Sequence, residues 1–326
     1  MATALATLMS LPAVSLSPHP TPIDELSRLR TAISSAPAPR LFMKRDDLLS
    51  FGCGGNKVRK LQTVIAEAQA QGADTLITCG GLQSNHARAT AAAGAALGLN
   101  VVLVLNGTAP ATPTGNTRLD LLFGADVRVV ASREDRAPTM QAVADELRAA
   151  GRRPFVVPLG ASTPIGALGF AKGVAEIVAA GIRPTVIIHS TSSGGTQAGL
   201  IAGCALLGVR ARVVGISADE PAPSLARTVG DLLDQMAVRL GAKRETLAGE
   251  HPIEIDDSEV GAGYGLPTAA STEALELTAR REGILLDPVY TAKAMAALIA
   301  RLRTGAFRAE DTVLFWHTGG QTGFFT

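Results

Sequence analysis

Residues 186–199 read Val186-Ile187-Ile188-His189-Ser190-Thr191-Ser192-Ser193-Gly194-Gly195-Thr196-Gln197-Ala198-Gly199. The apolar, β-branched start predicts a buried strand, and the small residues after it predict a tight turn that opens a helix. Free backbone N–H groups and the helix dipole converge on an anion at such a helix start. The pattern therefore predicts a phosphate site, formed by Ser192, Ser193, Gly194, Gly195 and Thr196.

The same loop argues against two familiar nucleotide sites. It does not end in Gly-Lys-Ser or Gly-Lys-Thr, as a nucleoside triphosphate loop does, and its glycines do not match the dinucleotide-binding fingerprint. Taken alone, the loop fits a structural strand-to-helix turn about as well as it fits a phosphate site. A second feature of the chain has to decide between these interpretations.

Short apolar runs of the same kind recur along the chain, separated by Ala-rich segments of helical length. They occupy residues 75–78, 101–105, 127–130, 155–157, 213–216 and 313–316. Strands that are apolar on both faces and alternate with helices are typical of parallel sheets covered on both sides. The sequence predicts an α/β fold with doubly wound parallel sheets. A Gly- and Pro-containing stretch near 160–169 suggests two domains, 57–167 and 1–56 plus 168–326.

The amino-acid composition limits the classes of molecule that we expect the protein to bind. The chain has 326 residues, of which 47% are hydrophobic, so it can bury a large core. Its 30 Lys and Arg residues against 29 Asp and Glu residues leave a formal charge of +1, without the basic surplus that attracts nucleic acid or anionic membranes. We expect small-molecule partners and further copies of the same chain.

The cysteines and the apolar segments indicate a cytoplasmic protein. Three widely spaced cysteines, without a Cys-x-x-Cys pair, suit a reducing compartment and predict no metal site. No Lys or Arg precedes Arg28, so the basic start of a secretory signal is missing. Residues 89–117 carry no charge, but glycines and prolines interrupt them, so we expect no membrane span.

Two further glycine-containing runs supply the second feature. They read Gly54-Gly55-Asn56-Lys57-Val58-Arg59-Lys60 and Gly80-Gly81-Leu82-Gln83-Ser84-Asn85-His86. A lysine that follows two glycines at a helix start is well placed to reach a bound ligand through its amine. Together with the phosphate loop, Lys57 predicts an enzyme that holds pyridoxal phosphate through a Schiff base, because that cofactor carries both an aldehyde and a phosphate.

Six ordered segments resemble the 1-aminocyclopropane-1-carboxylate deaminase and D-cysteine desulfhydrase family of fold-type-II pyridoxal phosphate enzymes. The resemblance runs from about Thr21-Pro22 to near the C-terminus, and its segments are Lys44-Arg45-Asp46-Asp47, Gly54 to Leu61, Gln83-Ser84-Asn85-His86, Gly263-Tyr264-Gly265-Leu266-Pro267, Asp287-Pro288-Val289-Tyr290-Thr291 and His317-Thr318-Gly319-Gly320. It implies two parallel-sheet domains like those of tryptophan synthase β, with the cofactor in the cleft between them, and a homodimer.

The resemblance also implies roles for individual residues. Lys57 would attach the cofactor and, once freed, act as a base, and Asn85 would contact the ring hydroxyl of the cofactor. Ser84 matches the active-site serine of the family, which would receive the substrate carboxylate together with Asn85 or assist proton transfer. Tyr264 and Tyr290 match two active-site tyrosines, and this chain has no other tyrosine.

Two threonines bear on the choice of reaction within this family. The cyclopropane-opening deaminases carry Glu and Leu at the positions of Thr291 and Thr318, whereas the desulfhydrases carry Thr at both. A neutral hydroxyl opposite the pyridine nitrogen leaves that nitrogen largely unprotonated, which suits β-elimination. We therefore take Thr318 as a cofactor contact, and Thr291 and Gln321 as substrate contacts. Gln197 and Gln321 depart from the desulfhydrase pattern, and Gln321 fits a loop position as well.

Other polar residues near the motifs have simpler interpretations. His86 is a candidate substrate contact, but a buried histidine at a helix start explains it better. The segment Lys44–Asp47 fits a solvated turn or a structural role beside the cofactor. Arg59 and Lys60 fit helix-surface charges or salt-bridge partners.

The expected activity is the conversion of D-cysteine to pyruvate, hydrogen sulfide and ammonia by a pyridoxal phosphate-dependent lyase. The enzyme alternatives are an L-cysteate sulfo-lyase, which would release sulfite, and a 1-aminocyclopropane-1-carboxylate deaminase. An alternative of another class is a non-catalytic α/β protein that binds a small molecule with the same glycine loops.

Overall fold

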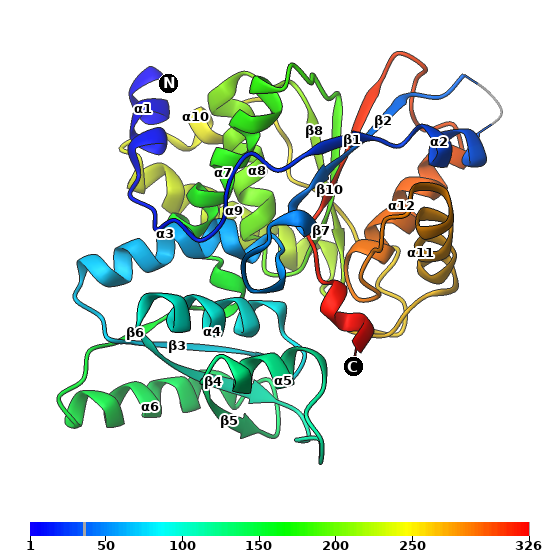
Figure 1. Ribbon diagram of the computed structural model, residues 1–326. Coiled ribbons are helices and arrows are strands. Elements are labelled where there is room, and N and C mark those ends of the chain that lie inside the picture. Colours follow the sequence, from blue (N-terminus) through cyan, green and yellow to red (C-terminus); the bar gives the residue numbers. More distant parts are fainter. Residues whose placement is uncertain (35–36, 326) are drawn as a thin grey trace.

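The computed structural model describes residues 1–34 and 37–325, which form two sheets. In this part of the chain, six strands form the larger sheet in the order β1-β2-β10-β7-β8-β9, and four form the smaller sheet in the order β5-β4-β3-β6 (Figure 1). All the pairs are parallel except β1 with β2. The strands are β1 Ile23–Glu25, β2 Arg40–Arg45, β3 Thr75–Gly81, β4 Asn100–Asn106, β5 Asp126–Val130, β6 Pro154–Val156, β7 Val186–Thr191, β8 Arg212–Ser217, β9 Glu254–Asp256 and β10 Thr312–His317.

The α/β class and the parallel sheets predicted from the sequence are confirmed. Each apolar run used for that prediction is a strand, namely β3 to β8 and β10. The prediction missed β1, β2 and β9. Two of these have only three residues, and β2 lacks β-branched residues and ends in Lys44 and Arg45, so neither composition nor length marked it as a strand.

Helices cover both faces of each sheet, as a doubly wound fold requires. The helices are α1 Ala2–Ser10, α2 Ser27–Ile33, α3 Lys57–Ala70, α4 Asn85–Leu97, α5 Gly115–Leu122, α6 Arg136–Ala149, α7 Pro164–Ala179, α8 Gly195–Leu207, α9 Ala222–Arg239, α10 Arg244–Ala248, α11 Ala269–Glu282 and α12 Thr291–Arg303. Short 3₁₀ turns occur at η1 Asp46–Leu48, η2 Phe51–Cys53, η3 Leu159–Ala161 and η4 Gln321–Phe325.

The period of two along each strand explains the layers of the larger sheet. Ile187, Val213 and Leu314 pack with α7, α8 and α9 on one face. Their neighbours Ile188 and Val214 pack with α11 and α12 on the other. Successive side chains of a strand point to opposite faces, so a strand that is apolar at every position needs a helix layer on each side.

The smaller sheet is built in the same way. Leu76 and Leu103 pack against α3 and α4, whereas Ile77 and Val102 pack against α6. Figure 1 shows this sheet and its helices below the larger sheet, with α3 between the two parts. We propose the domain boundaries near residues 57 and 167 that the sequence suggested. The four strands of the smaller sheet lie between these positions, and residue 167 falls inside α7.

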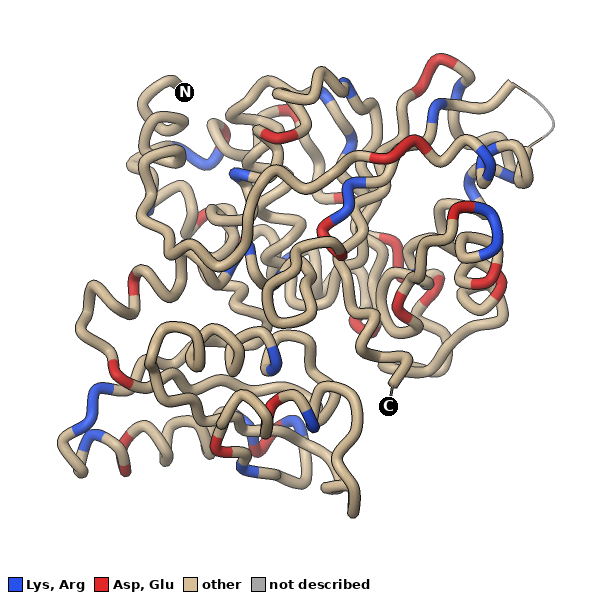
Figure 2. Tube along the Cα trace, in the orientation of Figure 1, with Lys and Arg blue, Asp and Glu red and all other residues tan. Residues whose placement is uncertain are grey.

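Charges of both signs are interspersed along both parts of the chain, in line with the formal charge of +1 (Figure 2). No helix in residues 1–34 and 37–325 is both long enough and apolar enough to span a membrane. The uncharged stretch 89–117 contains parts of α4 and α5 and the whole of β4 instead.

Candidate active site

A cavity of about 600 Å³ lies where strands of both sheets end. Gly80 and Gly81 reach it from the end of β3, Ser190 and Thr191 from the end of β7, and Thr318 from the residue after β10. Ligands of open parallel sheets bind at the carboxyl ends of the strands, because the loops that follow the strands leave a crevice there. This cavity is therefore the candidate active site.

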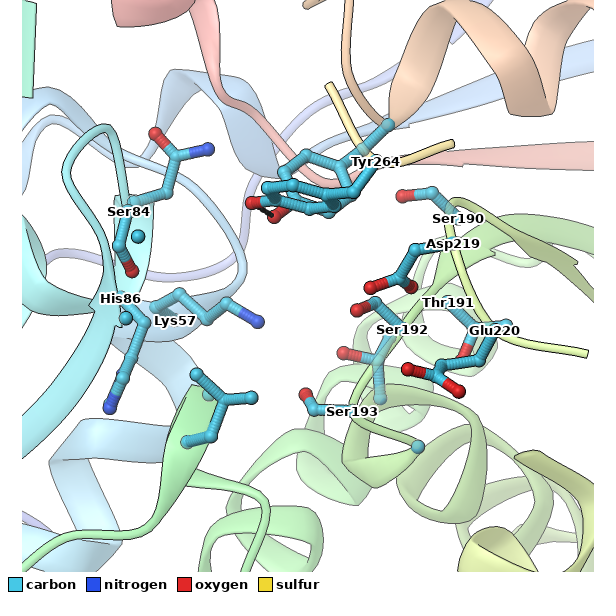
Figure 3. A pocket seen from close by; sticks show the side chains of 18 of the residues that line it. Lys57, Ser84, His86, Ser190, Thr191, Ser192, Ser193, Asp219, Glu220 and Tyr264 are labelled. Carbon is cyan, nitrogen blue, oxygen red and sulfur yellow. Dashed lines mark hydrogen bonds between the residues drawn. The ribbon is translucent and has the colours of Figure 1, made fainter. Parts of the chain in front are cut away.

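Lys57 is the first residue of α3 and lines the cavity. Figure 3 shows its amine pointing into the open space, with Ser84 and His86 on one side and Ser192 and Ser193 on the other. Burial lowers the pKa of this amine to about 8. A larger share of neutral amine is then present near neutral pH, so more of it is available to act as a nucleophile or to accept a proton.

The segment before Lys57 is held from two sides. The backbone N–H of Asn56 donates to the Thr318 carbonyl at 3.0 Å, and its side-chain amide donates to Thr196 Oγ1 at 2.9 Å. Gly54 has a φ of +74°, and a Cβ there would come within 2.4 Å of the Leu49 carbonyl oxygen. The two glycines ahead of the lysine thus permit a turn that other residues could not adopt.

The loop predicted to hold a phosphate also lines the cavity. Ser192, Ser193, Gly194 and Thr196 contribute to its wall, and α8 begins at Gly195. A Cβ on Gly195 would lie 2.6 Å from Ser162 Oγ, so glycine at this position lets Ser162 approach the start of α8. The Gly195 N–H donates to the Ser193 carbonyl at 2.9 Å and to Ser162 Oγ at 3.3 Å, and the other free N–H groups of the first turn of α8 are in place to bind an anion.

Lys60 stands behind this loop. Its amine lies 3.1 Å from Ser162 Oγ and 3.4 Å from the Gly160 carbonyl, and a Cβ on Gly195 would be 3.0 Å from it. Burial, reinforced by the Lys57 amine, holds the pKa of Lys60 well below its ordinary value. An anion at the start of α8 would favour the charged form of Lys60.

The interpretation of Arg59 and Lys60 as helix-surface charges is wrong, because both side chains are buried. For Arg59, the alternative of a salt-bridge partner is confirmed, since it pairs with Asp46 and Glu176. The interpretation of Lys44–Asp47 as a solvated turn is also wrong for Lys44 and Asp46, which are fully buried. A charged residue is hard to place from sequence alone when its partner is more than 100 residues away.

The start of α4 forms the wall on the side of the smaller sheet. Ser84 caps this helix, with its Oγ accepting a hydrogen bond from the Ala87 N–H at 3.2 Å, and both Ser84 and Asn85 line the cavity. Asn85 Oδ1 accepts hydrogen bonds from Asn116 Nδ2 at 2.9 Å and Thr322 Oγ1 at 3.2 Å. These bonds orient the Asn85 amide toward the ligand space.

His86 follows them in the wall but has the surroundings of a core histidine. Its Nε2 lies 2.7 Å from Thr78 Oγ1. Burial, with help from the Lys57 and Lys60 amines, holds the pKa of His86 well below its ordinary value, so the ring is neutral. Its predicted contact with the substrate stays a prediction.

Tyr264, from the loop before α11, and Tyr290, directly before α12, meet at the cavity. Their hydroxyl groups are hydrogen bonded to each other, and their ring centres are 5.8 Å apart with an angle of 67° between the ring planes. Burial raises the pKa of Tyr264, and burial together with the Tyr264 hydroxyl raises that of Tyr290 well above its ordinary value. Both hydroxyls therefore stay protonated at neutral pH and can donate hydrogen bonds.

The residues that were expected to select the reaction lie in different places. Thr318 lines the cavity, with its Oγ1 2.9 Å from Ser190 Oγ. Thr291 is buried and its Oγ1 is hydrogen bonded to Asp287. Within the described residues, neither Thr291 nor Gln321 is part of the cavity wall. Gln197 is also buried away from it, donating to the Glu254 carbonyl at 2.7 Å.

Sequence reasoning missed a group of charged residues at the cavity mouth. Arg133 follows β5, whereas Asp219 and Glu220 follow β8, and Arg133 Nη1 is 3.8 Å from a carboxylate oxygen of each. The Arg133 guanidinium also lies 5.2 Å from the centre of the Tyr264 ring. No local motif marks these residues. The available signal was their place directly after predicted strands, where parallel sheets bind ligands.

These residues fit pyridoxal phosphate. The cavity combines a buried lysine amine, a glycine-lined helix start for a phosphate, and hydroxyl groups at the ends of β7 and β10. Thr191 Oγ1 is buried at this wall with no hydrogen-bond partner among the described residues, which leaves it available to a ligand. This donor set matches the aldehyde, the phosphate and the ring of that cofactor.

Comparisons with known proteins agree with this chemistry. A family model described as pyridoxal-phosphate dependent enzyme matches residues 14–319. The D-cysteine desulfhydrase of Klebsiella pneumoniae (strain 342) is 36% identical over 98% of each chain, and that of Yersinia pestis (strain Pestoides F) is 37% identical over 98% of this chain and 96% of the relative.

Solved structures extend the comparison to the fold. A crystal structure of an ACC deaminase homologue has a TM-score of 0.90 and 35% identity, and the match covers 100% of this chain and 97% of that one. A threonine deaminase from Solanum lycopersicum has a TM-score of 0.71, 14% identity and coverage of 97% and 88%, which supports the fold alone. The chain therefore belongs to the pyridoxal-phosphate dependent enzyme family, and it is a fold-type-II lyase that uses pyridoxal phosphate.

Proposed function

We propose that the enzyme eliminates the β-substituent of D-cysteine and releases pyruvate, hydrogen sulfide and ammonia. The observation that carries this proposal is the meeting of Lys57, Ser84 and the Tyr264–Tyr290 pair around one cavity. The D-cysteine desulfhydrases among the relatives, at 36% and 37% identity over nearly the whole chain, support the choice of substrate.

In this proposal the chain holds the cofactor from three sides. Lys57 would bind the aldehyde carbon, the loop from Ser192 to Thr196 would bind the phosphate, and Asn85 and Thr318 would contact the ring. When bound, pyridoxal phosphate supplies a ring that stabilises negative charge at the α-carbon of an attached amino acid. Lys60, behind the loop, adds positive charge where the phosphate would lie.

The remaining residues manage the substrate and its protons. The Ser84 hydroxyl and the Asn85 amide bind the substrate carboxylate at the start of α4, where the helix dipole favours a negative charge. Once the substrate amine has displaced it from the cofactor, the free Lys57 amine would accept the α-proton, for which its lowered pKa suits it. The Tyr264 and Tyr290 hydroxyls stay protonated and can pass a proton to the departing sulfur.

A second candidate is 1-aminocyclopropane-1-carboxylate ring opening, which the similarity to the ACC deaminase homologue favours. The two threonines at positions 291 and 318 count against it, because the deaminases that this chain resembles carry Glu and Leu there. An L-cysteate sulfo-lyase is the third candidate and differs in its leaving group. The alternative of a non-catalytic protein that binds a small molecule is excluded, because the chain belongs to an enzyme family.

We also propose that the enzyme is a cytoplasmic homodimer. The three cysteines Cys53, Cys79 and Cys204 are all free thiols, which suits a reducing compartment. Sedimentation velocity at several protein concentrations tests the dimer. A single monomer peak at micromolar concentration would contradict it.

Product analysis separates the candidates. The purified protein is incubated with D-cysteine, L-cysteine, L-cysteate and 1-aminocyclopropane-1-carboxylate, while sulfide, sulfite and keto acids are measured. We expect sulfide and pyruvate in equal amounts from D-cysteine and at least about tenfold less product from the others. Sulfite from L-cysteate, or 2-oxobutanoate from the cyclopropane acid, as the faster reaction would replace the proposal by that candidate.

The role of Lys57 is tested separately. Replacement Lys57→Ala should abolish turnover and the cofactor adduct that borohydride fixes on the protein, whereas Lys243→Ala at an exposed position should change neither. Peptide mapping of the reduced protein identifies the labelled lysine. A label on Lys60 instead would transfer the assignment to that residue.

A further inference from the structure

A cluster of four charged side chains, of which Lys44, Asp46 and Arg59 are buried, joins the first turn of α3 to three other elements. Lys44 comes from β2, Asp46 from η1, Arg59 from α3 and Glu176 from α7. Arg59 donates to Asp46 through Nε and Nη2 at 2.7 Å each and to Glu176 through Nη1 at 2.6 Å, and Lys44 Nζ is 2.6 Å from Glu176. Two cations and two anions give the cluster no net charge.

Asp46 links the Gly55 backbone before Lys57 and the Arg59 side chain after it to strand β10. Its carbonyl accepts the Gly55 N–H at 3.1 Å, and its carboxylate accepts Trp316 Nε1 at 2.7 Å. Two residues beyond Trp316, the Thr318 carbonyl accepts the Asn56 N–H at 3.0 Å. These bonds form a closed circuit through Asp46, residues 55–56 and residues 316–318, which includes one edge of the cavity.

Backbone packing leaves this circuit little freedom. A Cβ on Gly319 would lie 2.6 Å from Gly55 Cα, and a Cβ on Gly55 would lie 3.0 Å from the Thr318 carbonyl oxygen. The chain before Lys57 therefore rests directly on the chain after β10. A shift of α3 would strain hydrogen bonds on both segments at once.

We propose that Arg59 and Asp46 are positioning residues that hold the Lys57 amine at its reacting position, an inference that rests on the proposed role of Lys57. Neither residue is part of the cavity wall, so they act through the backbone of the first turn of α3. Arg59 is two residues from Lys57, and its planar guanidinium binds Asp46 with two parallel hydrogen bonds, which fixes direction as well as distance.

The burial of these charges favours a role in positioning Lys57 over a role in stabilising the fold. Ions are costly to take out of water, and apolar side chains of similar volume often stabilise a core as well as an ion pair does. Reaction rates respond more sharply than stability to geometry, because a misplacement of about 1 Å can lower a rate about 100-fold. A cluster that ties three other elements to the turn carrying Lys57 meets the geometric requirement of the reaction.

The test replaces Arg59 by Lys, which keeps the charge and loses the planar fork. In the cofactor-free full chain, the rate of pyridoxal phosphate attachment is followed by absorbance and by borohydride fixation on the Lys57 peptide. We expect Arg59→Lys to slow attachment and to lower kcat for D-cysteine, each about 10-fold to 100-fold. The KM should change less than about threefold, because Ser84 and Asn85 stand on α4.

Arg301→Lys is the matched control, since Arg301 forms a part-buried ion pair with Asp256 at 2.6 Å on α12, outside the cavity wall. The attachment rate and kcat of this control should stay within about twofold of the wild-type values. Trp316→Phe is the second variant. It removes the donor to Asp46 together with part of the ring that packs on Phe170 at 5.3 Å, keeps all four charges, and should slow attachment at least about threefold.

Wild-type attachment rates in both Arg59→Lys and Trp316→Phe would overturn the proposal. If the melting temperature falls in the same variants, the cluster contributes to stability alone. If Arg59→Lys does not fold, the Trp316→Phe rate decides by itself. Borohydride fixation on a lysine other than Lys57 in the wild type would instead refute the proposed role of Lys57, so the two failures are distinguishable.

Discussion

The side-chain amide of Asn56 donates a hydrogen bond to Thr196 Oγ1 at 2.9 Å, across 140 residues of sequence. Asn56 directly precedes Lys57, and Thr196 lies in the first turn of α8. Both side chains are buried in the wall of the cavity. One bond thus sets the spacing between the lysine that would hold the aldehyde and the helix start that would hold the phosphate.

Replacement Asn56→Ala should weaken cofactor retention. The lost bond is worth about 1 kcal/mol, which corresponds to an increase of about fivefold in the Kd for pyridoxal phosphate. Absorbance titration of the cofactor-free protein measures this change. Asn100→Ala serves as the control, because Asn100 donates to the Asp74 carbonyl at an exposed position. An unchanged Kd for Asn56→Ala would mean that other contacts set the spacing.

Cofactor attachment should depend on pH through the Lys57 amine. Its pKa is lowered to about 8 by burial, and only the neutral amine attacks an aldehyde. The attachment rate of the cofactor-free protein should therefore fall about tenfold per pH unit below 8 and level off above 9. Stopped-flow absorbance between pH 6 and pH 10 measures the profile. A midpoint near 10.5, the ordinary value for lysine, would contradict the effect of burial.

The tyrosine pair should behave as one unit. Because the Tyr264 and Tyr290 hydroxyls are hydrogen bonded to each other, removing either one disturbs the same proton path. Tyr264→Phe and Tyr290→Phe should each lower kcat roughly 10-fold to 100-fold. The kcat of the double variant should be no lower than that of the less active single variant. Steady-state kinetics with D-cysteine and absorbance of the bound cofactor provide the measurements. Multiplicative losses would show that the two hydroxyls act independently.

Asp120, buried on α5, should make stability fall as pH rises. Burial raises the pKa of its carboxyl to about 7, against the opposing effect of Arg88. Because the folded-state pKa exceeds the unfolded value of about 4, the folded state alone keeps the proton between these values. The free energy of unfolding should drop by up to about 4 kcal/mol from pH 4 to pH 7 and stay level above that.

Urea unfolding or melting temperature as a function of pH tests this expectation. Asp120→Asn should lose that component of the pH dependence, whereas Asp231→Asn at an exposed position should keep it. Identical slopes for Asp120→Asn and the wild type would contradict a raised pKa. The comparison of slopes does not depend on how much each substitution changes stability at a single pH.

Local patterns in the sequence predicted much of the candidate site. The strand, loop and helix at 186–199 form β7 and α8, and Lys57 begins α3 as its glycines suggested. Each of these features depends on residues that are neighbours in the sequence, so their backbone preferences and apolar pattern predict it directly. The smaller strands were missed because three-residue segments such as β1 and β9 carry too little pattern.

The expected positions of Thr291 and Arg59 show the limit of such reasoning. Motif position suggested a substrate contact for Thr291, but its hydroxyl is hydrogen bonded to Asp287, inside the same turn. Adjacent charges suggested a surface for Arg59, but its partners Asp46 and Glu176 come from η1 and α7 and keep it buried. Motifs name the residues that lie near a site, and packing decides where each side chain points.

Sequence alone determined that this chain has parallel α/β units, a phosphate-type loop and a lysine suited to a pyridoxal phosphate enzyme. Tertiary structure decided which distant residues meet. β10 lies between β2 and β7, which brings Trp316 to Asp46 across 270 residues and Thr318 to Asn56. Strand order is set by the packing of whole layers, which the local periodicity of a strand does not encode.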